Sequence, residues 1–257
     1  MATTVSDSSD DADRYRAAQV GLTRLLVRDV RGLRRLILPS RLRESVPDWL
    51  AAMNTIVGQY ARTSAALAAD FYDAQREAAG VPSPFTVPVA DPPSDEQTEA
   101  SLRWATKDLW PRDPDEATPA QLQPMDVRLA QAEKKAEQVA QKLVTDTGRG
   151  TVREAVRQDR QATAWARAAA RGACAFCKLL AARGAVYKRD TADFRAHDGC
   201  HCGVVPVFKG QRFELSDHAK EWERIYREFA APHSGDQLRL FRRALAEHDS
   251  NPLPGSN

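Results

Sequence analysis

The sequence predicts a mainly α protein: an N-terminal helical hairpin and long helices, then a small α+β unit with a short antiparallel hairpin, then C-terminal helices. Three observations predict this fold class. Apolar residues recur at helical spacing through most of the chain. Proline-rich stretches separate the helical segments. Strand-like patterns occur only in one short region, which also contains all four cysteines.

Residues 1–80 are predicted to form the N-terminal hairpin. An apolar stripe follows one helical face over residues 14–38 and stops at a proline. The stripe consists of Leu22, Leu26, Val30, Leu33 and Ile37. Ser45 and Asp48 form a capping-box pattern, so we expect a second helix over residues 46–79 that returns antiparallel to the first.

The middle of the chain is predicted to alternate between linkers and helices. Residues 81–124 contain two proline clusters on either side of one short helix, 95–109, so we expect a proline-rich linker or extended arm there. Residues 125–147 are rich in Ala, Gln and Lys and have a narrow apolar stripe, which predicts a half-exposed helix. We expect Gly148 and Gly150 to end that helix.

The strand candidates follow one more predicted helix. Thr151 and Glu154 form another capping-box pattern, and the helix they begin is expected to reach about Arg171. Only residues 185–187 and 202–208 have convincing strand patterns. We expect these two segments to pair with each other as the antiparallel hairpin, across the loop between them.

Residues 211–257 are predicted to hold two amphipathic helices and a disordered tail. The first helix is marked by Trp222, Ile225, Tyr226 and Phe229, and the second by Leu238, Phe241 and Leu245. Ser234 and Gln237 are placed to cap the second helix. The last residues, 251–257, are expected to be disordered.

Charge is nearly balanced at +2, but it is unevenly spread. Nine arginines and one acid lie within residues 14–43, and eleven Lys or Arg and four acids lie within residues 149–195. Such patches suit nucleic-acid phosphates or a solvated helix face, and we prefer the solvated face for the first patch. No stretch approaches the roughly 18 apolar residues of a membrane span. The N-terminus is polar and acidic, so we expect an intracellular protein without membrane contact.

The four cysteines have the spacing of a zinc site. Cys174 and Cys177 form a C-x2-C step, which lets two thiolates from one turn reach the same ion. Cys200 and Cys202 form a C-x-C step, which places both sulfurs on one face of an extended segment. The unit around them, within residues 125–210, buries little apolar surface, so a metal would contribute folding free energy. We therefore predict a small α+β zinc-binding unit with a structural zinc ion.

Two other interpretations of the thiols stay open. A redox C-x2-C motif needs a low-pKa thiol at a helix N-terminus, preferably after a strand. The short helix predicted over residues 177–182 meets the first condition. However, no strand is expected ahead of it, and the second cysteine pair would have no role. Reduced cysteines without any ligand are the other alternative. Disulfides are disfavoured because the chain is predicted to be intracellular.

Residues 165–208 resemble the phage Mu F-like minor capsid or head-morphogenesis family, in the form common in phages of actinobacteria. The likeness rests on Trp165 and two runs of sequence. One run is C-A-F-C-K-L-L-A-A-R-G-A-V-Y, beginning at Cys174, and the other is H-D-G-C-H-C-G-V-V-P-V-F, beginning at His197. The combination is specific, although each piece alone would be weak. The N-terminal helices resemble the family only in their general plan.

The resemblance implies a low-copy virion component that acts in procapsid assembly or in DNA packaging and delivery. Its implied location is the capsid interior or portal region, and the host cytoplasm during assembly. The implied partners are phage portal, capsid and scaffold proteins, with non-specific contact to packaged DNA. The resemblance also gives five candidate zinc ligands: Cys174, Cys177, His197, Cys200 and Cys202. The four cysteines are our first choice, and replacement of Cys200 by His197 is the second. His201 is expected to point away from the metal.

Three functions compete. The first is a non-catalytic head-morphogenesis protein, which we prefer. The second is a zinc-stabilised nucleic-acid-binding module. Its phosphate-binding residues would be Arg171, Lys178, Arg183, Lys188, Arg189 and Arg195. The third is a zinc hydrolase or nuclease that uses His197 and Asp198, but four thiolates favour a closed site. We see no Ser/His/Asp trio with a shared location and no phosphate-binding loop, so we predict that the chain is not an enzyme.

Overall fold

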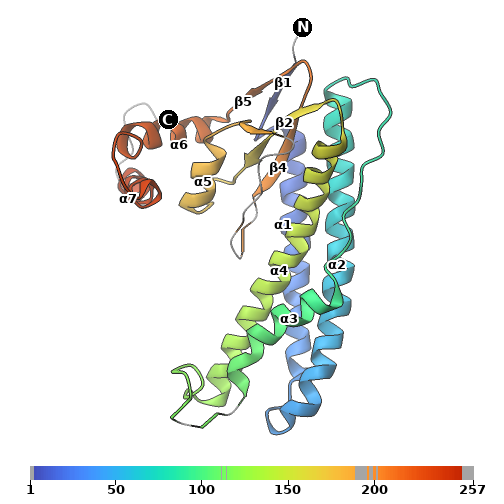
Figure 1. The fold of residues 1–257 in the computed structure, drawn as a ribbon, viewed down its shortest axis with the longest axis vertical. Helices are drawn as coiled ribbons and strands as arrows, with labels where there is room; N and C mark the ends of the chain where they lie inside the picture. The colour runs from blue at the N-terminus through green and yellow to red at the C-terminus, as the bar shows by residue number, and fades with distance from the viewer. Residues whose placement is uncertain are drawn as a thin grey trace.

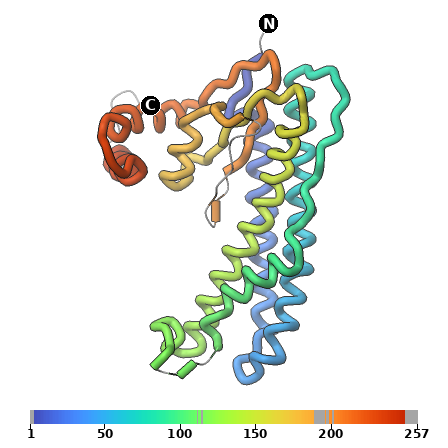
Figure 2. The backbone as a smooth tube through the Cα atoms, viewed as in Figure 1, coloured from blue at the N-terminus to red at the C-terminus, as the bar shows by residue number. Residues whose placement is uncertain are grey.

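The computed structural model describes residues 3–110, 112–113, 115–188, 196, 199–200 and 202–250. The chain forms a long helical stalk with a smaller α+β unit at one end (Figures 1 and 2). The stalk consists of α1 (Asp10–Leu33), α2 (Leu42–Ala78), α3 (Asp95–Thr106) and α4 (Met125–Gln158). The α+β unit consists of β1 (Thr3–Ser6), β2 (Ala162–Ala168), α5 (Ala175–Ala181), β3 (Tyr187–Lys188), β4 (Gly203–Phe208), β5 (Gln211–Glu214), α6 (Asp217–Phe229) and α7 (Gln237–Ser250). The predicted fold class is confirmed.

The N-terminal hairpin of α1 and α2 is present, but the predicted start of α2 is wrong. The helix begins at Leu42, before the expected capping box. The Ser45 hydroxyl accepts a hydrogen bond from the Leu38 backbone N–H (3.0 Å) and donates one to the Arg41 carbonyl (2.8 Å). Ser45 therefore lies inside the first turns of α2, and its side chain holds the segment between α1 and α2 in place by hydrogen bonds.

The predicted extended arm and its short helix are confirmed. Residues 81–94 run down the side of the stalk as an extended segment (Figure 1). The Ser94 side chain then caps α3, accepting a hydrogen bond from the Gln97 backbone N–H at 3.2 Å. The Ala90 backbone N–H donates to the Thr151 hydroxyl (3.1 Å), which fixes the arm to α4.

The predicted break between two helices at Gly148 and Gly150 is wrong, because α4 continues through both glycines to Gln158. A Cβ atom at position 148 would lie 2.5 Å from the Ser64 hydroxyl oxygen, so this glycine permits close packing of α4 on α2. Thr151 is buried inside α4 and donates to the Thr147 carbonyl (3.2 Å), so it does not cap a helix.

The region after α4 is a strand, although the sequence predicted a helix as far as about Arg171. Strand β2 is the centre of an antiparallel sheet of order β3-β2-β4. Trp165 lies opposite Tyr187 on one side, and Ala166 lies opposite Val205 on the other. The two predicted strand segments therefore do not pair with each other, because β2 lies between them. Pairing on both edges outweighs the helical preference of an alanine-rich segment.

A second, two-stranded sheet connects the N-terminal segment with the α+β unit. Strand β1 runs parallel to β5, with Val5 opposite Phe213. Sequence patterns gave no sign of this pairing. It places the N-terminal strand beside residues about two hundred positions later in the chain.

Within the described part of the chain, three buried clusters form the core. The first joins α1, α2, α3 and α4 along the stalk, and so combines residues from the predicted segments 1–80, 81–124 and 125–210. The second lies where the stalk meets the sheet, and the third fills the α+β unit beneath α5, α6 and α7. The division into these segments and 211–257 stays a prediction.

The two C-terminal helices are confirmed, but the predicted cap of α7 is wrong. The Arg239 backbone N–H donates to the Asp236 carboxylate (3.0 Å), so Asp236 occupies the capping position. The Gln237 side chain instead accepts a hydrogen bond from the Tyr226 hydroxyl (2.7 Å). Residues 251–257, for which disorder was predicted, lie outside the described residues.

Candidate metal centre

Three cysteine sulfurs meet inside the α+β unit. Cys177 lies in the first turn of α5, and Cys200 and Cys202 lie on the segment that leads into β4. All three side chains are buried, and their sulfurs lie within 4.8 Å of one another. The Cys177 and Cys200 sulfurs are 3.3 Å apart. The predicted convergence of the C-x2-C and C-x-C elements is thus present for these three residues.

Of the two other predicted ligands, Cys174 and His197, the structure describes only Cys174. Cys174 is the N-cap of α5, and its sulfur accepts a hydrogen bond from the Cys177 backbone N–H at 3.5 Å. It is exposed and does not belong to the group of three sulfurs within 4.8 Å. His197, Asp198 and His201 lie outside the described residues. The choice of the fourth ligand stays a prediction.

The donor set suits a tetrahedral thiolate site. Sulfurs bound at about 2.3 Å to one tetrahedral ion lie roughly 3.8 Å apart. The separations here, from 3.3 Å to at most 4.8 Å, lie on both sides of that value. The Cys202 backbone N–H donates to the Cys200 sulfur (3.4 Å), and the C-x2-C step makes a similar N–H···S contact. The three buried thiols can therefore bind a metal ion.

Crowding of three thiols shifts their pKa values in opposite directions. The pKa of Cys200 lies far below its usual range, because Cys177 and Cys202 donate S–H hydrogen bonds to its sulfur. The pKa of Cys177 is strongly raised, first because its thiol donates to Cys200 and then because it is buried. The bond with Cys177 lowers the pKa of Cys202, but the interaction with Cys200 and burial outweigh it, giving about 12. Cys200 is therefore the favoured thiolate of the cluster.

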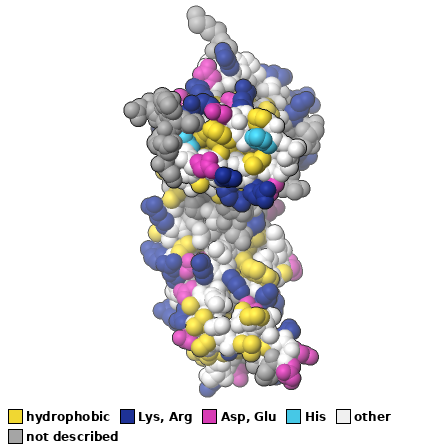
Figure 3. Space-filling model, turned by 90° about the vertical axis from the view of Figure 1, so that its left-hand side faces the viewer, with side chains coloured by type: hydrophobic (Ala, Val, Ile, Leu, Met, Phe, Trp, Pro, Cys, Tyr) yellow, Lys and Arg dark blue, Asp and Glu magenta, His cyan; other side chains and the backbone are white. Residues whose placement is uncertain are grey.

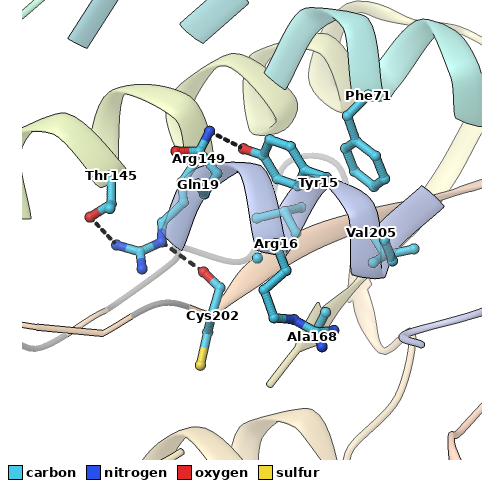
Figure 4. A pocket seen from close by; sticks show the side chains of 12 residues that line it. Tyr15, Arg16, Gln19, Phe71, Thr145, Arg149, Ala168, Cys202 and Val205 are labelled. Carbon is cyan, nitrogen blue, oxygen red and sulfur yellow. Dashed lines mark hydrogen bonds between the residues drawn. The ribbon is translucent and has the colours of Figure 1, made fainter. Parts of the chain in front are cut away.

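Arg149 of α4 supports the thiol-bearing segment and was missed by the sequence analysis. Its side chain is buried, and its Nε donates to the Cys202 carbonyl at 2.9 Å (Figure 4). Its Nη2 donates to the Cys200 carbonyl. The predicted break at Gly148 had placed Arg149 in a loop, so no sequence signal pointed to this role.

A second buried arginine approaches the cluster from β2. The Arg167 Nη1 lies 3.9 Å from the Cys177 sulfur, and its guanidinium lies 5.9 Å from the centre of the Phe176 ring. The side chain is 1% exposed. Two guanidinium groups therefore bring positive charge to a site whose ligands become negative when they bind metal.

A small pocket of about 20 Å³ adjoins the cluster at the junction of α1, α2, α4 and β4 (Figure 4). Tyr15 and Phe71 stack in it with ring centres 4.5 Å apart, while Arg149 and Cys202 line another part. Burial raises the pKa of Tyr15 to about 12, so its phenol is neutral. The pocket is mainly apolar, and residues of both the stalk and the α+β unit line it.

The structure also forms a Ser/His/Asp cluster, which the sequence analysis did not expect. The Ser216 hydroxyl donates to the Asp7 carboxylate (2.9 Å), and the Ser216 backbone N–H donates to the same carboxylate (2.7 Å). The His218 Nε2 lies 3.1 Å from the Ser216 oxygen and 3.8 Å from Asp7. In a catalytic triad, the aspartate binds the ring nitrogen away from the serine. Here one ring nitrogen faces both groups, so the cluster attaches the N-terminal segment to α6.

The basic residues of the nucleic-acid hypothesis are partly exposed on the α+β unit. Arg171, Arg183 and Lys188 are exposed, whereas Lys178 is half-buried, with its Nζ 5.5 Å from the centre of the Trp222 ring. Arg189 and Arg195 lie outside the described residues. Figure 3 shows Lys and Arg side chains gathered on the edge of the α+β unit nearest the stalk.

Fold and site together define a class: a mainly helical stalk protein with a small cysteine-based unit that can bind metal. Residues 6–229 match the family described as VG15 protein, and the chain therefore belongs to the VG15 family. This is a viral and phage gene family, which makes the chain a phage-type protein. No curated protein and no solved structure matches it. Among the described residues, no helix has both the length and the apolar character needed to cross a membrane.

Proposed function

We propose that the protein is a minor capsid or head-morphogenesis protein of a tailed phage or prophage, with a structural zinc ion in its α+β unit. The observation that carries the proposal is the VG15 match over residues 6–229, which includes the stalk and the three buried thiols. The Mu F-like motif over residues 165–208 supports the finer assignment, because its cysteines supply this cluster.

Zinc is the metal that best suits this donor set. Thiolates are soft ligands that select zinc over magnesium, calcium or manganese. A set of four protein ligands leaves no open position, so the ion would act in folding and not in catalysis. We accordingly propose that the protein is not an enzyme.

The stalk is suited to contact other proteins. Leu38, in the connection between α1 and α2, and Leu122, in the loop before α4, are 46% and 62% exposed. Both segments lie at the end of the stalk far from the α+β unit (Figure 2). Trp104 of α3 is also exposed, at 49%. Exposed large apolar side chains support a role in protein contacts, and we propose portal, capsid or scaffold proteins as the partners, in the capsid interior or portal region.

A genetic experiment tests the assembly role. Deletion of the gene from its phage or prophage should reduce the yield of DNA-filled heads, as counted by electron microscopy after induction. Wild-type protein supplied in trans should restore filled heads, whereas Cys177→Ser should not. A normal yield of infectious, filled heads after deletion would contradict the proposal.

A nucleic-acid-binding module stays the second candidate, because Arg171, Arg183 and Lys188 are exposed on one unit. A protein that neutralises phosphates loses affinity steeply as salt rises. Binding to duplex DNA that weakens by orders of magnitude between about 50 mM and 200 mM salt would favour this candidate. Binding that also disappears in the triple variant R171E/R183E/K188E would assign it to these residues.

A further inference from the structure

We propose that Arg149 is a positioning residue of the metal centre, and that it couples metal binding to the docking of the α+β unit on the stalk. This inference rests on the zinc centre of the proposed function. It concerns a residue of the stalk that is not itself a ligand. The junction it describes lies between α4 and the segment that carries Cys200 and Cys202.

The contacts of Arg149 cross from the stalk to the ligand segment. Its Nε donates to the Cys202 carbonyl at 2.9 Å, and its Nη2 donates to the Cys200 carbonyl. The guanidinium thus binds the backbone of both cysteines in the C-x-C step. Because a sulfur is two bonds from its own Cα atom, fixing this backbone limits each of the two sulfurs to the few positions that its χ1 rotamers allow.

Two residues of α4 hold the guanidinium itself in place. Its Nη1 donates to the Asp146 carboxylate at 2.7 Å and to the Thr145 hydroxyl at 3.2 Å. The arginine is 5% exposed, so water has little access to its guanidinium. A planar guanidinium with its donors fixed in a fork has little freedom to reorient. A lysine at this position could not reproduce the same set of contacts.

The positive charge of Arg149 is a second way in which this residue favours the metal-bound state. A zinc ion with three thiolates has a net charge of about −1, and with four thiolates about −2. The guanidinium of Arg149 lies on one side of the cluster, and that of Arg167 lies 3.9 Å from the Cys177 sulfur on another. Buried positive groups of this kind stabilise the charged, metal-bound state over the neutral thiols.

The same contacts imply a reciprocal effect. Metal binding orders the C-x-C segment, and the ordered segment presents both carbonyls to Arg149. The free energy by which Arg149 favours the bound metal must equal the free energy by which the metal favours the Arg149 contacts. Zinc should therefore tighten the junction between the α+β unit and α4, well outside the ligands.

Zinc affinity of the full chain, measured by competition with a chromophoric chelator, tests the positioning role. We expect Arg149→Met to weaken zinc binding by about 10- to 100-fold, the usual effect of losing a residue that orients metal ligands. Arg149→Lys should also weaken it, since lysine keeps the charge but loses the fork. The matched control is Arg157→Met, which removes an exposed arginine of the same helix that pairs with Glu154. It should bind zinc like the wild type.

Hydrogen exchange supplies a readout that a purely structural role would not change. In the wild type, adding zinc should slow amide exchange over residues 145–152 of α4 as well as in the α+β unit. In Arg149→Met, zinc should slow exchange in the α+β unit alone. If Arg149→Met does not fold, Asp146→Asn replaces it. Asp146 is 40% exposed and orients the guanidinium, so a weaker loss of affinity is expected.

The outcomes separate this inference from the proposed zinc centre. If wild-type protein binds no zinc, the zinc centre itself is wrong. If the wild type binds zinc and the folded Arg149 variants bind it equally well, the zinc centre stands and the positioning role is overturned. If zinc does not slow amide exchange over residues 145–152 of the wild-type protein, the coupling between metal binding and α4 is overturned.

Discussion

At the scale of single residues, the candidate metal centre consists of three thiols and the charged groups around them. Cys177, Cys200 and Cys202 were recognisable from their spacing, because the ligand geometry of zinc constrains sequence directly. Arg149 and Arg167 were not recognisable. Their roles come from burial and from contacts between distant parts of the chain, and neither leaves a local pattern.

The thiol pKa values predict that zinc uptake releases protons. In metal-free protein, Cys177 and Cys202 have raised pKa values, so both remain protonated at neutral pH. Zinc binds thiolates, so binding at pH 7 should release about two protons from these two thiols, in addition to any proton of the fourth ligand, and affinity should fall as pH falls. Calorimetry in buffers of different ionisation enthalpy measures this number. Uptake of zinc without proton release would contradict the pKa assignment.

A second residue-scale prediction concerns Asp159, at the end of α4. Its carboxylate accepts hydrogen bonds from Arg76 (2.7 Å) and Tyr72 (3.1 Å), and all three side chains are buried. Asp159→Asn leaves Arg76 buried without its counter-charge. We expect the free energy of unfolding to fall by about 3–5 kcal/mol in urea denaturation. The exposed pair of Arg243 and Glu247 supplies the control. Glu247→Gln should change the free energy of unfolding by less than about 1 kcal/mol.

At the scale of elements, periodicity predicted helices well and their ends less well. Apolar stripes correctly identified α1, the first part of α4, α6 and α7, because each buries one face. Gly148 and Thr151 suggested helix ends, because glycine is typical of the end of a helix and threonine of its start. In the structure, Gly148 permits close packing of α4 on α2, and the Thr151 hydroxyl accepts a hydrogen bond from the extended arm. Strand β2 was missed because its partners are far away in the sequence.

In the substitution Gly148→Ala, close packing and helix propensity have opposite effects on the free energy of unfolding. Glycine to alanine inside a helix normally stabilises by about 1 kcal/mol. At position 148, the new methyl group would lie 2.5 Å from the Ser64 hydroxyl, so Gly148→Ala should lower the free energy of unfolding by about 1–3 kcal/mol.

The matched control for this substitution is Gly21 of α1. A Cβ atom there meets nothing within 4 Å, so Gly21→Ala should stabilise the protein. Both variants are compared with wild type by urea denaturation. A stabilising Gly148→Ala would show that α2 and α4 are not packed as closely as described.

At the scale of the whole molecule, the α+β unit is attached to the stalk by elements from both ends of the chain. Strand β1 pairs with β5, and Asp7 binds the backbone and hydroxyl of Ser216 at the start of α6. Arg149 makes a separate attachment from α4. The sequence motif covers only the cysteine region, residues 165–208. In the structure, the unit that contains this region packs against the N-terminal segment and the stalk.

Loss of the Asp7 attachment should loosen the α+β unit while leaving the stalk intact. Asp7 is completely buried, and Asp7→Ala leaves the N–H and hydroxyl of Ser216 without their acceptor. We expect a loss of about 1–3 kcal/mol for each buried polar group left unsatisfied. Hydrogen exchange should become faster in β1, β5 and α6 but not in α1 or α2. Faster exchange throughout the stalk would contradict a local role for Asp7.

The zinc content of the purified protein decides whether the three thiols form a structural metal centre. Full-length protein purified without chelator is analysed by elemental mass spectrometry, together with Cys177→Ser. The account predicts one zinc per chain in the wild type. In the variant, it predicts loss of zinc and unfolding of the α+β unit, with the helices of the stalk retained by circular dichroism. Wild-type protein that is folded and contains no zinc, or a Cys177→Ser variant that retains it, would contradict the account.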